Sequence, residues 1–196
     1  MKQGKISWKR VFILLGALVG ICLIASVALF IFGRPVADAL RARLWKTDPK
    51  LAAQVAHQMI DYDLPPAYQE LKFLDMGSSA DTVMIANLEQ PADFILITQV
   101  PDGILATEYQ TGVEEKWSRE ISEHHYDTHT VSTQAVTVRG LPTTLRIMEG
   151  TDENGRPIRQ GVCMFTGKSG DVLLVLVAGQ DTWDQTMVEQ FLQSIR

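Results

Sequence analysis

Cysteine is scarce in this 196-residue chain, and its two copies lie far apart in the sequence. Cys22 belongs to an apolar run near the start, and Cys163 is the single cysteine of the remainder. A disulfide framework within the folded part is therefore excluded. Cys163 sits in the strand-like stretch Gly161–Phe165, and an apolar setting of this kind is typical of a buried, unreactive thiol.

The recognised motifs of catalysis and cofactor binding are also missing. No Gly-x-Ser-x-Gly nucleophile motif occurs in the chain. The Gly-Lys-Ser-Gly sequence of Gly167–Gly170 lacks the Gly-x4-Gly-Lys frame of a phosphate-binding loop, so we predict a hairpin turn there. The sequence assigns no catalytic residue and no cofactor, and it favours a protein that is not an enzyme.

Positive charge is scarce beyond the first 50 residues. Leu51–Arg196 holds 9 Lys and Arg against 21 Asp and Glu, a net charge of −12, whereas Met1–Lys50 holds 9 against 2, a net charge of +7. Binding to nucleic-acid phosphates needs a basic face on the protein. We therefore predict no nucleic-acid partner for the acidic part of the chain.

What the chain does contain is one long apolar run. Val11–Gly33 has 23 residues without a charge, preceded by Lys9 and Arg10 and followed by Arg34. A helix of this length spans about 34 Å, enough to cross a hydrocarbon core of about 30 Å. The run is longer than the apolar core of a cleaved secretory signal, and no small-x-small cleavage site closes it. We predict an uncleaved anchor that contacts membrane lipid.

This anchor divides the chain into four predicted regions. Residues 1–10 form a basic tail, 11–33 the transmembrane helix, 34–48 a juxtamembrane linker and 49–196 one folded domain. Lys and Arg nearly balance on the two sides of the anchor, so their count alone does not set the topology. Because a long domain is translocated largely regardless of its charge, we expect a single-pass protein with a cytoplasmic N-terminus and an extracytoplasmic domain.

Apolar periodicity predicts the elements of that domain. A first helix is expected at Pro49–Ile60, opened by the capping side chain of Asp48, and a last helix runs from a cap at Asp181 or Thr182 to Ile195. A third helix is expected within Leu105–Ile121. The predicted strands are Tyr68–Met76, Thr82–Leu88, Ala92–Val100, Thr128–Arg139, Thr143–Glu149, Pro157–Thr166 and Asp171–Ala178. Two groups of antiparallel strands with three helices make an α+β fold, a sheet covered by helices.

Three stretches carry a resemblance to known proteins. Gly179–Asp184, with the sequence Gly-Gln-Asp-Thr-Trp-Asp, and Phe191–Ile195, with Phe-Leu-Gln-Ser-Ile, together resemble the end of PsbP-like α/β/α sandwich domains. Ile60–Tyr68 is similar to a stretch in membrane-anchored bacterial proteins of unassigned function. The resemblance covers about residues 49–196 and implies a PsbP-like fold. Members of this group serve as accessory or binding subunits, which is what the resemblance implies here by analogy.

His124, His125, Asp127 and His129 form the densest polar cluster of the sequence. If Glu123–Thr130 is extended, His125, Asp127 and His129 share one face, and imidazole with carboxylate suits a divalent metal. Adjacent strand residues point apart, however, and no fourth ligand is close in the sequence. Solvated loop histidines are the competing interpretation.

Two hypotheses follow. The first is a membrane-anchored extracytoplasmic binding or accessory module, a non-catalytic subunit or partner of a membrane complex. It predicts contacts with lipid and with a membrane protein, and it leaves any small-molecule ligand unidentified. The alternative is a metal-dependent protein or enzyme that uses the His124, His125 and His129 cluster, with His125, Asp127 and His129 as the candidate ligands.

Overall fold

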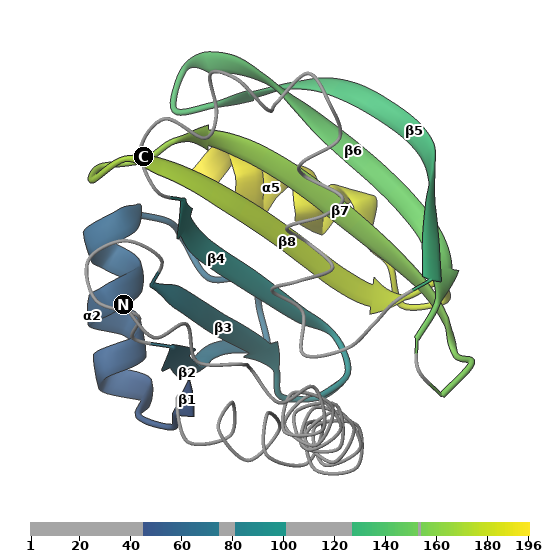
Figure 1. Cartoon of the computed structure of the whole chain (residues 1–196), viewed down its shortest axis with the longest axis horizontal. Helices are drawn as coiled ribbons and strands as arrows, with labels where there is room; N and C mark the ends of the chain where they lie inside the picture. Colours follow the sequence, from purple (N-terminus) through teal and green to yellow (C-terminus); the bar gives the residue numbers. More distant parts are fainter. Residues whose placement is uncertain (1–44, 75–80, 101–126, 153) are drawn as a thin grey trace, which may run out of the picture. The chain divides into compact units, whose positions relative to one another are not determined.

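The computed structural model describes residues 45–74, 81–100, 127–152 and 154–196, which belong to one compact unit beginning at Trp45. Within these residues the chain forms eight strands and two helices (Figure 1). The strands are β1 (Trp45–Lys46), β2 (Tyr68–Leu74), β3 (Thr82–Asn87), β4 (Phe94–Val100), β5 (Asp127–Val138), β6 (Leu141–Thr151), β7 (Pro157–Thr166) and β8 (Asp171–Gly179). The helices are α2 (Pro49–Met59) and α5 (Gln185–Ser194).

All eight strands belong to one antiparallel sheet in the order β1-β2-β3-β4-β8-β7-β6-β5. The sheet consists of two meanders, β1 to β4 and β5 to β8, which join where β4 pairs with β8 (Figure 1). In that central pair Leu96 lies opposite Val175. The predicted α+β class, with an antiparallel sheet and covering helices, is confirmed, and β1 and β5 are the edge strands of the sheet.

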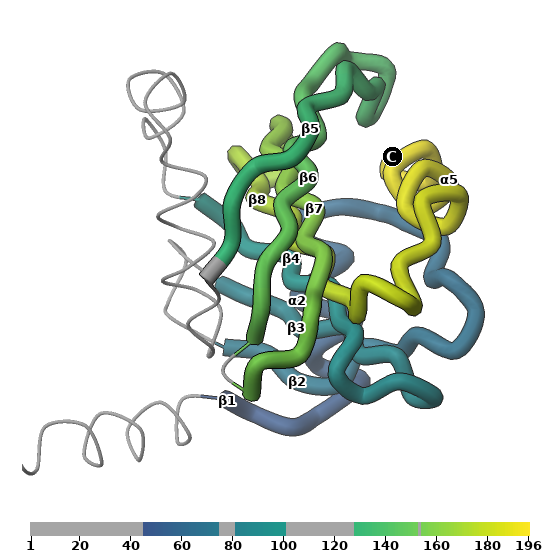
Figure 2. Tube along the Cα trace, turned by 90° about the vertical axis from the view of Figure 1, so that its right-hand side faces the viewer, coloured from purple at the N-terminus to yellow at the C-terminus, as the bar shows by residue number. Residues whose placement is uncertain are grey.

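One face of the sheet packs against both described helices. Figure 2 shows α5 on one side of strands β5, β6 and β7. Fully burying an aliphatic or aromatic side chain contributes about 1.5–3 kcal/mol, so this layer supplies much of the domain's stability. Its helical members are Ala52, Ala56 and Met59 from α2 and Val188, Phe191 and Leu192 from α5, all 2% exposed or less.

The opposite face of the sheet is also apolar and buried, although neither described helix packs on it. On β8, alternate residues point to opposite faces, yet each face receives only aliphatic side chains there. This continuous apolar run is typical of a strand covered on both sides. The helix that the sequence predicts within Leu105–Ile121 lies outside the described residues. The side chains of β8 on the helical face are Val172, Leu174 and Leu176, and those on the second face are Leu173, Val175 and Val177.

An aspartate caps the N-terminus of each described helix. The Asp48 carboxylate accepts hydrogen bonds from the backbone N–H of Lys50 and Leu51, both at 3.1 Å, as the sequence predicted. The predicted cap of the last helix, Asp181 or Thr182, is wrong. Asp184 caps α5 instead, because the chain first makes a turn in which the Thr182 N–H donates to the Gly179 carbonyl at 3.1 Å.

Several strand ends also differ from the prediction. β4 begins at Phe94 rather than Ala92, because the Asp93 N–H closes a turn onto the carbonyl of Gln90 at 2.8 Å. β6 is longer than expected at both ends and starts at Leu141. The reason is a two-residue hairpin turn at Arg139–Gly140, whose φ values of 53° and 75° are those of a type I′ turn.

Two further outcomes concern the first part of the chain and the cysteine. Within the described ranges no helix is long and apolar enough to cross a membrane, and the predicted transmembrane helix at 11–33 lies outside them. Strand β1 lies in the segment 34–48 that was expected to be a linker, and its Trp45 packs against the second apolar face. Cys163 is fully buried, which confirms the prediction of a buried thiol.

Candidate functional site

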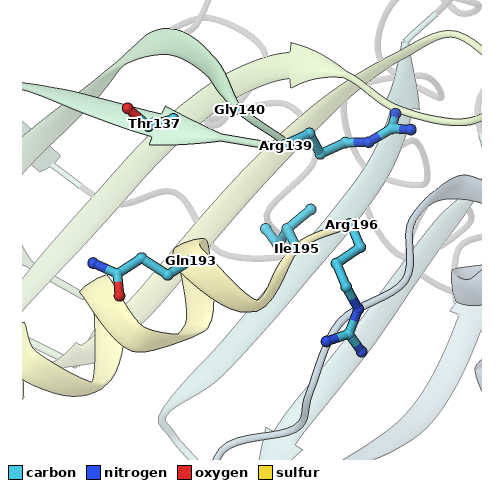
Figure 3. A pocket seen from close by; sticks show the side chains of 6 residues that line it. All are labelled: Thr137, Arg139, Gly140, Gln193, Ile195 and Arg196. Carbon is cyan, nitrogen blue, oxygen red and sulfur yellow. The ribbon is translucent and has the colours of Figure 1, made fainter.

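A groove runs between the edge strand β5 and helix α5. Its first part is a hollow of about 320 Å³, lined by Gln134–Thr137 of β5 and by Glu189, Leu192 and Gln193 of α5. The second part is a hollow of about 530 Å³ that extends to the Arg139–Gly140 turn and to Arg196 (Figure 3). Thr137 and Gln193 line both hollows, so we treat them as one continuous feature, the β5–α5 groove.

The β5 side of this groove is the edge of the strand. Successive side chains of a strand point to opposite faces, yet four consecutive residues, Gln134–Thr137, line the same hollow. The hollow therefore borders the backbone of β5 and not only one face of it. Val136 packs against the core on the helical side, and Leu192, 2% exposed, supplies apolar floor from α5.

A hydrogen-bond network closes one end of the groove. The Gln185 side-chain amide donates to the side-chain oxygens of Gln134 and Glu189, both at 3.1 Å. The Trp183 indole N–H in turn donates to the Gln185 side-chain oxygen at 3.1 Å. This network ties α5 to β5, and it engages one oxygen of the only carboxylate among the described lining residues, Glu189.

The other end of the groove carries two arginines, with Ile195 between them (Figure 3). Arg196 pairs with Asp63, with 2.9 Å between Nη2 and Oδ1, and the hydrogen bond and charge of Asp63 raise the pKa of its guanidinium. Arg139 donates from Nη1 to the Thr166 carbonyl at 2.9 Å. No carboxylate side chain of the described residues is paired with Arg139, whereas Asp63 offsets the charge of Arg196.

A buried carboxylate fixes the connection that leads into α5. Asp93 is 2% exposed and accepts hydrogen bonds from the Gly179 N–H at 3.0 Å and from the Thr182 hydroxyl at 2.7 Å. The Arg156 guanidinium lies 3.7 Å from it. Because Gly179 ends β8 and Thr182 precedes the helix, this cluster helps to set the position of the α5 wall of the groove.

Arg156 also lies beside Asp152, in the hairpin turn that the sequence predicted at Asp152–Gly155. Burial favours a higher pKa for Asp152, but the N–H groups of Arg156 and Asn154 and the Arg156 charge outweigh it and lower the pKa from 3.8. Gly155 takes a φ of 75°, as this turn requires.

The histidine cluster falls only partly within the described residues. His124 and His125 lie outside them, Asp127 begins strand β5, and His129 is an exposed residue of the same strand. The register places His129 opposite Glu149. The Glu149 carboxylate bonds with Arg159, and this hydrogen bond is the main reason why its pKa is lowered from 4.5.

Among the described residues, no group of three His, Cys, Asp or Glu side chains is arranged to hold a metal ion. The metal site at His125, Asp127 and His129 therefore stays a prediction. The predicted hairpin turn at Gly167–Gly170 is present, closed by the Gly167 N–H to the Gly170 carbonyl at 2.7 Å.

The groove residues were not singled out from the sequence. Arg139 offered one signal, because a type I′ turn favours Asn before Gly, and an arginine there is an uncommon choice. Arg196 and Gln193 offered none, since exposed polar residues at the end of a helix are ordinary. Chemically, the groove presents backbone edge, apolar floor and N–H donors for an anion. Its described lining holds no pairing of a nucleophile with a base.

Comparison with known proteins returns several structural likenesses. No family model matches the chain, and no curated protein matches it. The structure is similar to the solution structure of cyanobacterial PsbP (CyanoP) from Synechocystis sp. PCC 6803, at 15% sequence identity and a TM-score of 0.39, over 71% of this chain and 92% of that chain. A PsbP protein, from the group that the sequence resembles, is thus among the structures returned. A likeness of this size concerns the fold and carries no information about activity, ligands or partners.

Proposed function

We propose that this chain is a membrane-anchored binding or accessory module whose domain lies outside the cytoplasm and serves a partner in a membrane complex. The anchor and the topology rest on the apolar run Val11–Gly33 and on the long acidic stretch that follows it. The module itself makes its contribution by binding and not by catalysis.

The β5–α5 groove is the observation that carries the proposal. It combines the accessible edge of a strand, a partly apolar lining and the guanidinium of Arg139 at one end. Binding sites of proteins combine apolar surface with a few polar groups that fix orientation. The described lining offers one carboxylate, Glu189, and that group is bonded to Gln185. Such a lining suits recognition better than acid–base chemistry.

The test is purification of the full chain from membranes in a mild detergent, after brief crosslinking, with mass spectrometry of everything recovered. A membrane protein should be recovered reproducibly with the wild-type chain, and its crosslinks should map to residues of the groove. Arg139→Asn is the matched variant, because asparagine suits the turn while the guanidinium is lost. Recovery of the chain only as a monomer, with no partner after crosslinking, would refute the proposal.

A further inference from the structure

We infer that the β5–α5 groove binds an extended peptide segment of a partner protein, which adds as a ninth strand to the edge of β5 and places an acidic side chain at Arg139. This inference rests on the proposed function and names the partner chemistry of the same site. The mode is strand addition, in which backbone hydrogen bonds provide affinity and side-chain contacts provide specificity.

The first support is the character of β5 as an edge. It has 12 residues, it ends the strand order, and no described strand pairs with its outer side. Sheet edges are usually protected from further pairing by Lys, by Pro or by shortness. Residues 128–138 contain no Lys, Arg, Asp, Glu or Pro. Most of their side chains are exposed, Val131 at 45% among them. Among the described residues, the protective feature of this edge is a bulge between Thr130 and Ser132, which lies outside the groove.

The second support is the size of the groove. Along β5 it runs from the Gln134–Gln185 bridge to the Arg139 turn. At about 3.4 Å per residue this distance is about 17 Å, enough for roughly five extended residues. Its apolar lining consists of the half-buried Val136 and of Leu192 and Ile195, each 2% exposed. A segment with apolar residues at every second position fits them.

The third support is Arg139 itself. Its backbone is in the left-handed region, with φ of 53°, a conformation that costs a non-glycine residue energy and that Asn or Gly adopts more readily. Residues held in conformations of this kind cluster at functional sites. Arg139 has a guanidinium without a carboxylate partner among the described residues, and it lies at the open end of the groove. Charge complementarity therefore selects a carboxylate on the peptide.

The orientation of the peptide follows from the sheet. All strand pairs of the described sheet are antiparallel, and antiparallel pairing is slightly more stable per residue than parallel pairing. β5 runs toward Arg139, so an antiparallel peptide has its N-terminal residue at Arg139. The acidic residue then comes first, followed by alternating polar and apolar residues.

The experiment uses the full chain in detergent micelles and measures fluorescence anisotropy of labelled peptides. The probes are acetyl-Glu-Thr-x-Thr-x-Thr-amides with Val, Ile or Leu at both x positions. Saturable binding is expected, and replacing Glu by Gln should weaken it about fivefold, because a charge-assisted hydrogen bond is lost. N-methylation of alternate peptide residues should abolish binding for one set and leave it nearly unchanged for the other, since only every second N–H of a strand faces a given neighbour.

Two variants separate recognition from folding. Arg139→Asn should bind the Glu and Gln peptides equally while its melting temperature stays within a few degrees of wild type. Lys50→Gln removes one exposed positive charge on α2 and should leave the Glu preference intact. The inference is overturned by absent saturable binding at 1 mM probe, on the order of the weakest specific affinities. Equal effects of the two N-methylated peptide sets on binding also overturn it. So does a dimer of the chain that the probe peptides do not dissociate. A partner that still co-purifies in those cases leaves the proposed function standing.

Discussion

Replacing Asp93 by alanine should destabilise the domain by about 2–3 kcal/mol. The carboxylate is 2% exposed and accepts hydrogen bonds from the Gly179 N–H and the Thr182 hydroxyl. Without it the buried Gly179 N–H has no acceptor, which costs about 1–3 kcal/mol. The Thr182 hydroxyl retains a weaker bond to the Gly179 carbonyl at 3.3 Å, and Arg156 retains Asp152. The total loss of stability is therefore smaller than the loss of about 3–5 kcal/mol that follows when one partner of a buried ion pair is removed.

Thermal unfolding followed by near-ultraviolet circular dichroism gives the measurement. For a domain of this size 1 kcal/mol lowers the melting temperature by about 2–4 °C, so Asp93→Ala should lower it by roughly 5–10 °C. Asp93→Asn keeps an acceptor for the Gly179 N–H and should lower the melting temperature by about half as much. Asp63→Ala is the matched control, because its ion pair with Arg196 is exposed and worth at most about 1 kcal/mol. Equal shifts for Asp93→Ala and Asp63→Ala would contradict the importance of the buried cluster.

Three further predictions concern helix capping, acid and metal. Asp184→Ala should cost about 1 kcal/mol in chemical denaturation, because two N–H groups of α5 lose their acceptor. The domain should weaken below about pH 4, since the pKa of Asp61 is held below 3.8, mainly by the hydrogen bond from Lys168. A carboxylate with a lower pKa in the folded state stabilises above its unfolded value and loses this effect as the pH falls through the folded value. In the Lys168→Gln variant, the free energy of unfolding should therefore fall less steeply as the pH is lowered. The binding-module proposal predicts no stoichiometric divalent metal in the purified full chain, whereas bound metal that is lost in the His125→Ala, His129→Ala double variant would establish the metal alternative.

Much of the sheet could be predicted from the sequence because its signals are local. The continuous apolar run of β8 and the apolar stretch Gly161–Phe165 within β7 depend on neighbouring residues alone, and the predicted bounds of β7 agree with the structure. The α2 cap was predictable for the same reason, since Asp48 bonds to N–H groups two and three residues away. The cap of α5 was not, because Thr182 is engaged by Asp93, 89 residues away. Local sequence patterns contain no information about that contact.

Local patterns in the sequence suffice to predict the class of the fold, the positions of most strands and both described helices, the burial of Cys163 and a membrane anchor, because periodicity, capping and hydropathy act over short stretches. Tertiary packing sets the strand order, which makes β5 an edge of the described sheet. It also decided which side chains meet across the groove. Arg139 and Arg196 are 57 positions apart in the sequence, and no local pattern links them. They line one hollow because the β5–β6 turn and the end of α5 come together when the sheet and helix pack.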